Sequence, residues 1–189
     1  MPYIQNATSF LIQAILDFAL YIVLLRFWMQ WVRADFRNQF GQFIITVTNP
    51  VVIPLRKVLP SIRTIDTATI VLAFIISFIK VYAFFALLTD ITGITPLLYF
   101  LMSLGVVIKY SIYLMIVCIL IQAIVSWVNP HSYHPIVAVA RSISEPIMAP
   151  ARRIIPPIGG LDLSPIIVLL FLHVSLIIIV APLLRGFPI

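Results

Sequence analysis

The sequence predicts an all-α integral membrane protein with four transmembrane helices, arranged as two parallel two-helix repeats. Hydrophobic residues make up 62% of the chain and charged residues 10%, whereas soluble domains carry about 25% charged residues. Four apolar segments are long enough to cross the hydrocarbon core as helices, which takes about 20 residues each. A proline- and arginine-containing element also occurs twice, at an offset of 96 residues from Pro50 to Pro146.

The four predicted spans follow the same offset. We place them near Ser9–Val32, Thr67–Thr89, Gly105–Val128 and Leu163–Arg185. Adding the offset to the first two spans gives the last two, so we expect a first repeat at residues 1–95 and a second at 96–189. Each repeat crosses the membrane twice and therefore starts and ends on the same side. The repeats are predicted to be parallel, related by an axis near the membrane normal.

The positions of the basic residues predict the orientation. Loops 33–66 and 129–162 hold most of the Lys and Arg residues, whereas the N-terminal tail and the connector 90–104 hold none. Cytoplasmic loops carry an excess of Lys and Arg. Both long loops are therefore expected in the cytoplasm and both termini on the outer side.

Each long loop contains an amphipathic pattern. Apolar residues recur at helical spacing at two sets of positions: Phe40, Phe43, Ile44 and Val47, and Ile136, Val139, Ala140 and Ile143. This spacing predicts a helix of about three turns, lying in the headgroup layer. It is expected to end before Pro50 or Pro146, because a residue that precedes proline is disfavoured in the α conformation.

The duplicated element follows each amphipathic pattern and reads P-x-x-x-P-x-R-[KR]-x-x-P-x-x-x-x-x-D. Its prolines are Pro50, Pro54 and Pro60 in the first copy, and Pro146, Pro150 and Pro156 in the second. A proline inside a helix removes a hydrogen bond and clashes with the preceding turn. The element is therefore predicted to form two short turns joined by kinks.

The basic pair of the motif has two interpretations. In the functional one, Arg56, Lys57, Arg152 and Arg153 bind an anion: lipid phosphate, an acidic partner segment or a small solute. Each basic residue near an anionic leaflet contributes roughly 1 kcal/mol to membrane binding. In the structural one, these residues set the topology and donate hydrogen bonds to carbonyls freed by the prolines.

The aspartates that close the motif, Asp66 and Asp162, also have two interpretations. Each precedes a span, where a carboxylate can cap the positive end of a helix. Alternatively, Asp66 pairs with Arg56 and Asp162 with Arg152, which would hold the loop against the span.

Four charged residues lie inside the predicted spans, and such residues are functional candidates. Arg26 and Lys109 are near span ends and can extend toward water. At 1.5 Å per residue, Asp17 lies roughly 12 Å and Lys80 roughly 13–14 Å from the outer ends of neighbouring antiparallel spans. The shared depth predicts an intramembrane Asp17–Lys80 pair, either a structural link within the first hairpin or a proton- or cation-linked site.

No catalytic motif accompanies these charges. The sequence has no Ser/His/Asp arrangement, no phosphate-binding glycine loop and no Cys/His cluster of metal-ligand spacing. We therefore expect a protein that is not an enzyme, with no cofactor, no metal and no direct nucleic-acid binding.

The duplicated motif, following an apolar span with Arg26 and Trp31, resembles that of the YggT family of bacterial membrane proteins, which has relatives in chloroplasts. The second copy departs from this pattern at Gln122, where the first has Arg26. The resemblance implies an inner-membrane protein without an established catalytic activity. It also implies roles of the kind linked to family members: osmotic adaptation, cell division and envelope organisation, and in plastids cytochrome assembly and nucleoid placement.

Two functional hypotheses follow for a bacterial inner-membrane protein with periplasmic termini. The first is a non-enzymatic scaffold or assembly factor that binds anionic lipids and a cytoplasmic or membrane protein partner. The alternative is a small ion or osmolyte permeation protein, functioning as a homo-oligomer because four spans enclose little lumen.

Overall fold

The computed structural model describes residues 2–62, 65–88, 95–128, 134–154 and 162–184. Apart from an isolated bridge between Ile62 and Ile65, the regular elements within these ranges are helices. They are α1 (Pro2–Trp31), α2 (Gln39–Val58), α3 (Thr67–Leu88), α4 (Pro96–Val128), α5 (Pro135–Ile154), α6 (Ser164–Ser175), the π-helix η1 (Leu176–Val180) and α7 (Ala181–Leu183). The predicted all-α architecture is confirmed.

Four helical segments are long and apolar enough to cross a membrane, as predicted: Asn6–Trp31, Thr67–Leu87, Pro96–Ser126 and Ser164–Leu183. The third begins earlier than expected, so residues 96–104 are helical rather than part of a connector. Pro96 occupies the first helical position, where its missing N–H costs nothing. The backbone carbonyl of Thr95 accepts hydrogen bonds from the amides of Leu98 and Tyr99.

The fourth span changes helix type before it ends. The Ala181 amide bonds to the carbonyl of Leu176, five residues back instead of four, and Pro182 follows directly. Proline has no amide hydrogen and clashes with the carbonyl four residues earlier. The wider π turn just before Pro182 relieves that clash within a continuous span.

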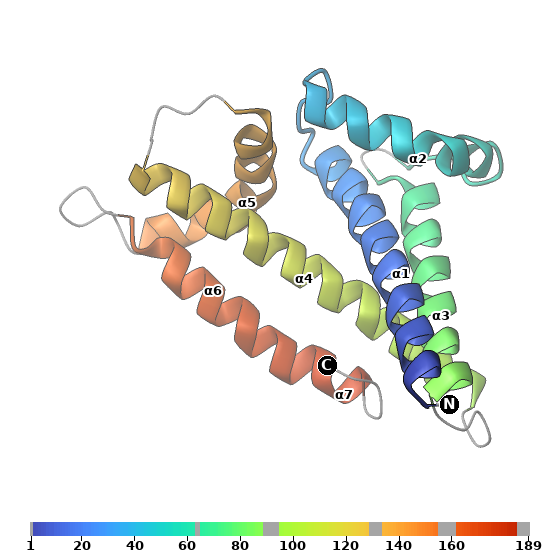
Figure 1. The fold of residues 1–189 in the computed structure, drawn as a ribbon. Helices are drawn as coiled ribbons and strands as arrows, with labels where there is room; N and C mark the ends of the chain where they lie inside the picture. The colour runs from blue at the N-terminus through green and yellow to red at the C-terminus, as the bar shows by residue number, and fades with distance from the viewer. Residues whose placement is uncertain (1, 63–64, 89–94, 129–133, 155–161, 185–189) are drawn as a thin grey trace.

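The spans pack around α4. Helices α1 and α3 pack together as an antiparallel hairpin, and α4 contacts both of them as well as α5 and α6 (Figure 1). Helices α2 and α5 lie at one end of the bundle, away from both ends of the described chain (Figure 1). Their bounds obey the 96-residue offset, and we call positions related by that offset corresponding positions. The parallel relation of the two repeats stays a prediction.

The prediction that the loop helices end before Pro50 and Pro146, and that the motif forms two kinked turns, was wrong. Helix α2 continues through Pro50 and Pro54, and α5 continues through Pro146 and Pro150. All four prolines are exposed. Two prolines spaced by four share one helix face, so the carbonyls that they leave unbonded lie together on the outer face, where they can bind water.

The inward face of α2 is formed by Gly41, Ile44, Thr48 and Val52, and the corresponding residues Val137, Ala140, Ser144 and Met148 form that of α5. The predicted apolar stripe is therefore only partly buried. Ile44, Val139, Ala140 and Ile143 are buried, whereas Phe43, Val47 and Ile136 are exposed. The inward face includes small and polar residues because it meets side chains of the spans, and a purely apolar pattern misses these positions.

Candidate functional site

In the first half of the chain, Arg56 at the end of α2 joins the loop helix to two spans. Its Nη2 and Nε donate to the two carboxylate oxygens of Asp66, which precedes α3, the Nε–Oδ1 distance being 3.3 Å. Its Nη2 also donates to Gln30 Oε1 of α1 at 2.8 Å. Asp66 is fully buried. The arginine thus ties α2 to α1 and to the start of α3.

In the second half, Arg152 occupies the corresponding place. Its Nε donates to Asp162 Oδ2 at 2.9 Å, and its Nη1 lies 3.0–3.1 Å from both oxygens of Glu145. Asp162 Oδ1 also accepts from the amide of Ser164 at 2.9 Å and from its hydroxyl at 2.6 Å. Asp162 therefore combines both predicted roles, helix cap and ion pair. The Asp66 side chain pairs with Arg56 and leaves capping to its carbonyl, which accepts from the Ile70 amide.

A second pair of positions connects each loop helix to its span. In the first half, Arg26 Nη1 donates to Thr48 Oγ1 and, at 2.9 Å, to Asn49 Oδ1. In the second half, the Ser144 hydroxyl donates to Gln122 Oε1. The contact is thus kept at corresponding positions although Arg26 has become Gln122. Arg26 reaches these α2 side chains and is buried, so the expectation that it extends to water was wrong.

The two clusters carry opposite net charges. The first contains two cations, Arg26 and Arg56, with one carboxylate, Asp66. The second contains one cation, Arg152, with two carboxylates, Glu145 and Asp162. The change of Asn49 to Glu145 therefore accompanies the change of Arg26 to Gln122, and each arrangement brings every charged group of its cluster to a hydrogen-bonding partner.

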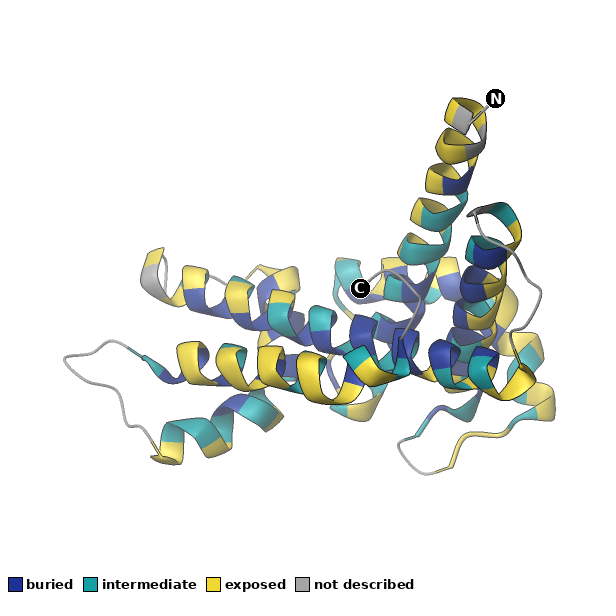
Figure 2. Ribbon diagram, turned by 90° about the horizontal axis from the view of Figure 1, so that it is seen from below, coloured by how far each residue is buried: buried dark blue, intermediate teal, exposed yellow. Residues whose placement is uncertain are grey.

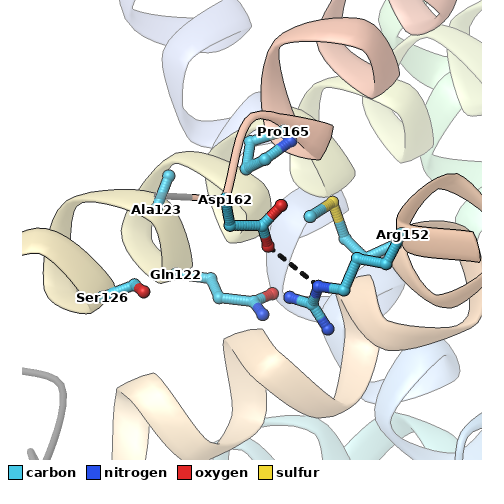
Figure 3. Close-up of a pocket in the computed structure, with 7 residues that line it drawn as sticks. Gln122, Ala123, Ser126, Arg152, Asp162 and Pro165 are labelled. Carbon is cyan, nitrogen blue, oxygen red and sulfur yellow. Dashed lines mark hydrogen bonds and ion pairs between the residues drawn. The ribbon is translucent and has the colours of Figure 1, made fainter. Parts of the chain in front are cut away.

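The second cluster differs from the first in having a small cavity beside Arg152. The cavity has a volume of about 20 Å³ and is lined by the polar residues Gln122, Ser126, Arg152 and Asp162 together with the apolar Ala123, Met148 and Pro165 (Figure 3). In the first half, Gln30 corresponds to Ser126 and reaches Arg56, whereas the serine side chain is shorter. A polar cavity of this size is sufficient for one water molecule. The shorter Ser126 side chain therefore leaves a space beside Arg152, whereas Gln30 contacts Arg56.

The ionisation of Asp162 predicts a loss of stability in acid. Burial acts to raise its pKa, but hydrogen bonds from Ser164 and Arg152 outweigh burial and lower the pKa below its ordinary value. An aspartate with a depressed folded pKa stabilises the fold above its unfolded pKa of about 3.9, and this stabilisation is lost as the pH falls through the folded pKa.

We therefore expect the thermal unfolding temperature of the detergent-solubilised protein to decrease when the pH is lowered below about 4. The loss should be smaller in Asp162→Asn, and thermal unfolding between pH 6 and 2 measures both profiles. Equal acid slopes for the wild type and the variant would contradict the assignment.

The second cation of each motif is placed differently from the first. Lys57 and Arg153 are exposed, whereas Arg56 and Arg152 are half-buried and engaged by carboxylates. Of the four residues considered for anion binding, the structure leaves Lys57 and Arg153 facing outward. Pro60 follows the end of α2 and is exposed, and Pro156 lies outside the described residues.

An intramembrane cluster joins three spans. Lys80 Nζ of α3 forms an ion pair with Asp17 Oδ1 of α1, so the structure brings together the two residues that the sequence placed at one depth. Tyr110 of α4 donates its hydroxyl to the same Asp17 oxygen at 2.6 Å, and its ring packs at a tilt against that of Tyr21, with centroids 4.9 Å apart. The pair therefore also anchors α4, a connection that sequence reasoning missed.

Lys109 belongs to the same region. Its Nζ lies 5.9 Å and 5.7 Å from the ring centroids of Tyr110 and Tyr113, and Lys80 Nζ lies 5.2 Å from that of Tyr110. Lys109 is buried, so the expectation that it extends to water was wrong. Aromatic faces attract ammonium groups, and the tyrosines hold Lys109 within the bundle. Among the described residues, no group of three or more His, Cys, Asp or Glu side chains could hold a metal ion.

Comparison with known proteins identifies relatives over nearly the whole chain. The CCB3/YggT family model matches residues 5–88 and 94–183. "Uncharacterized protein YggT" of Escherichia coli K12 is 38% identical over 172 residues, covering 90% of this chain and 87% of that protein. A Vibrio alginolyticus protein is 38% identical over 169 residues, with 89% and 91% covered. A Haemophilus influenzae protein is 33% identical over 167 residues, with 88% of each chain covered. No solved structure matches the chain.

Proposed function

Since this chain belongs to the CCB3/YggT family and is a multi-pass membrane protein, we propose that it acts as a non-enzymatic scaffold or assembly factor of the bacterial inner membrane. Helices α2 and α5 lie in the cytoplasmic headgroup layer, and both termini are periplasmic. This orientation places the exposed basic residues at the anionic leaflet.

One observation carries the proposal: in each half, one cation of the motif fixes the loop helix and the next cation faces outward. Arg56 and Arg152 hold α2 and α5 against the spans through Asp66 and Asp162. Lys57 and Arg153 are exposed one residue later. This arrangement produces two rigid basic edges at one end of the molecule, which suit anionic lipid headgroups and an acidic segment of a partner protein.

Photocrosslinking in living bacterial cells tests this function. The probe is placed at Val58 and, separately, at Ile154, corresponding residues that are 78% and 79% exposed and adjoin the outward cations. We expect a discrete protein adduct that is lost on Lys57→Glu or Arg153→Glu. Arg141→Glu is the matched control, because Arg141 is exposed on α5 but has no basic counterpart in α2. Adducts with lipid alone, or adducts insensitive to both substitutions, would contradict partner docking.

The intramembrane cluster supports a second candidate, the permeation of a small ion or osmolyte. Asp17, Lys80 and Lys109 place ionisable groups inside the spans, where they are costly and often mark transport pathways. Proteoliposomes containing the purified protein would then show solute flux that Asp17→Asn abolishes. Absence of flux in the wild type would remove this candidate and leave the scaffold proposal intact.

A further inference from the structure

One face of α4 meets the first half of the chain at Tyr99 and Tyr110. Residues at helical spacing along this face are buried: Tyr99, Met102, Val106, Tyr110 and Leu114 are all no more than 9% exposed. The Tyr99 ring lies 6.0 Å from that of Phe78, and Phe100 lies 5.1 Å from Phe74. The contact between the two halves therefore combines this α4 face with side chains of α1 and α3.

The corresponding face of α1 is uncovered. Tyr3, Phe10 and Phe18, which correspond to Tyr99, Val106 and Leu114, are 87%, 71% and 64% exposed. Asn6 and Ala14, at the places of Met102 and Tyr110, are also exposed. Figure 2 shows the N-terminal turns of α1 projecting from the rest of the molecule with mostly exposed residues. We call this face the α1 stripe.

A groove continues the α1 stripe. It has a volume of about 370 Å³ and is lined by ten residues of α1, α2 and α3, among them Phe18, Val47 and Val51. Of the ten corresponding residues in the second half, eight are buried and two are half-buried. Helix α1 packs against both α4 and α5 there. What is an open groove in the first half is therefore a packed seam in the second.

The surface that does the covering also has an exposed counterpart. In the first half it includes Tyr21, Phe74 and Phe78. The corresponding residues Val117, Leu170 and Val174 are 49%, 65% and 42% exposed. We call these three residues the α4/α6 face. The contact between the halves thus leaves one unmatched surface on each half, and the two unmatched surfaces are of complementary kinds.

The substitutions between the halves preserve this complementarity. Within the chain, the small Asp17 side chain meets the large Tyr110. At the corresponding positions, the large Tyr113 would meet the small Ala14, and Leu176 replaces Lys80. Size complementarity is kept, with the large and the small residue exchanged between the two surfaces. Both members of the ion pair are replaced by uncharged residues. A contact between molecules at these surfaces would therefore bury no unpaired charge.

We propose that the α1 stripe and its groove bind the α4/α6 face of a second copy of this chain, repeating the contact between the halves. In the second half, the α4 face that corresponds to the α1 stripe packs against the first half of the same chain. By the same correspondence, the α1 stripe is expected to pack against the second half of another copy. Helix interfaces in membranes favour small residues that allow close approach, and Ala14 supplies one at the centre of the stripe. Such a contact joins two different surfaces, so it builds a closed ring or an extended row of molecules.

Disulfide crosslinking in native membranes tests the proposal. Two differently tagged chains, both with Cys118→Ala, are produced together. One chain carries Ala14→Cys and the other carries Val117→Cys. These positions correspond to Tyr110 and Tyr21, whose rings are 4.9 Å apart. A short bifunctional maleimide is used alongside oxidation, because it also bridges Cα atoms farther apart than the roughly 7 Å that a disulfide spans. We expect a mixed-tag dimer with roughly tenfold greater yield than in a control that pairs Ala14→Cys with Ile178→Cys.

Ile178 is a matched control because it is exposed, and Tyr82, to which it corresponds, is more exposed than Phe78 of the contact between the halves. Tyr82 lies at a depth close to that of Ala14, since Gln13 Nε2 donates to the carbonyl of Lys80, two residues before Tyr82. A mixed-dimer yield equal to this control would overturn the proposal and assign the groove to lipid acyl chains. A dominant dimer between two Ala14→Cys chains would overturn it in favour of a symmetric contact.

A second variant separates loss of assembly from loss of folding. Ala14→Trp adds bulk at an exposed position, so the thermal unfolding of the single molecule should be unchanged. It should abolish crosslinking between Ile4→Cys and Leu170→Cys, which correspond to the neighbouring rings of Phe100 and Phe74. Undiminished crosslinking in a normally folded Ala14→Trp protein would contradict the proposed contact.

Discussion

Replacing Arg56 with leucine is expected to destabilise the protein by about 3–5 kcal/mol, because removing one partner of a buried ion pair leaves the other charge uncompensated. Asp66 is 0% exposed, and Arg56 is its charged partner in the described structure. Denaturant unfolding of the purified protein in detergent measures the loss. The double variant Arg56→Leu/Asp66→Asn should recover much of it, since the buried Asp66 carboxylate is then removed together with its partner.

The corresponding change, Arg152→Leu, is a built-in comparison. The carboxylates of Glu145 and Asp162 are 46% and 20% exposed, and Asp162 keeps its hydrogen bonds to Ser164. We therefore expect a smaller loss, about 1–2 kcal/mol, as for a partly solvated pair. Lys57→Leu should change stability by no more than about 0.5 kcal/mol, because it alters an exposed residue. Equal losses for Arg56→Leu and Arg152→Leu would contradict the difference in burial.

Breaking the intramembrane pair is expected to have the second large effect. Lys80→Leu leaves the Asp17 carboxylate with the Tyr110 hydroxyl as its described polar contact, and Asp17→Asn leaves the Lys80 ammonium group without its counterion. A charged residue near the centre of a membrane helix costs about 3 kcal/mol. Each single variant should therefore lose stability of that order, whereas Asp17→Asn/Lys80→Leu should recover most of the loss.

A double-mutant cycle on unfolding free energies measures this coupling. A double variant no more stable than the worse single variant would show that the two charges do not act as a pair. Flux measured on the same variants separates structure from transport. A stable double variant that retains the cellular function of the wild type would exclude a proton- or cation-linked role for the cluster.

The sequence was sufficient to predict the spans and the pairing of Asp17 with Lys80. Span positions follow from apolar length, and the depths of Asp17 and Lys80 follow from counting residues along antiparallel helices. The pairing of Arg56 with Asp66, and of Arg152 with Asp162, was one of two interpretations, and the duplicated spacing alone could not choose between them. The choice depends on where the loop helix lies relative to the next span, which is a tertiary property.

Three features could not be read from the sequence, each for a physical reason. The disfavoured α conformation of a residue before proline predicts that α2 ends before Pro50. That local preference takes no account of Pro50 and Pro54 sharing an outer face. The contact of Tyr110 with Asp17 joins positions 93 residues apart, and no periodicity links the two. The contact of Arg26 with Thr48 and Asn49 had a signal in retrospect: both Arg26 and Asn49 differ from their corresponding residues, Gln122 and Glu145, by one charge.

That paired difference relates both clusters to one hypothetical neutral arrangement. A unit with glutamine on the span and asparagine on the loop helix carries no extra charge at either place. From such an ancestor, one substitution of glutamine by arginine gives the cluster around Arg26, and one substitution of asparagine by glutamate gives the cluster around Glu145. At these two positions, each present-day cluster therefore differs by one charge from such a neutral form. In each half the added charge lies beside a hydrogen-bonding partner, Asn49 for Arg26 and Arg152 for Glu145.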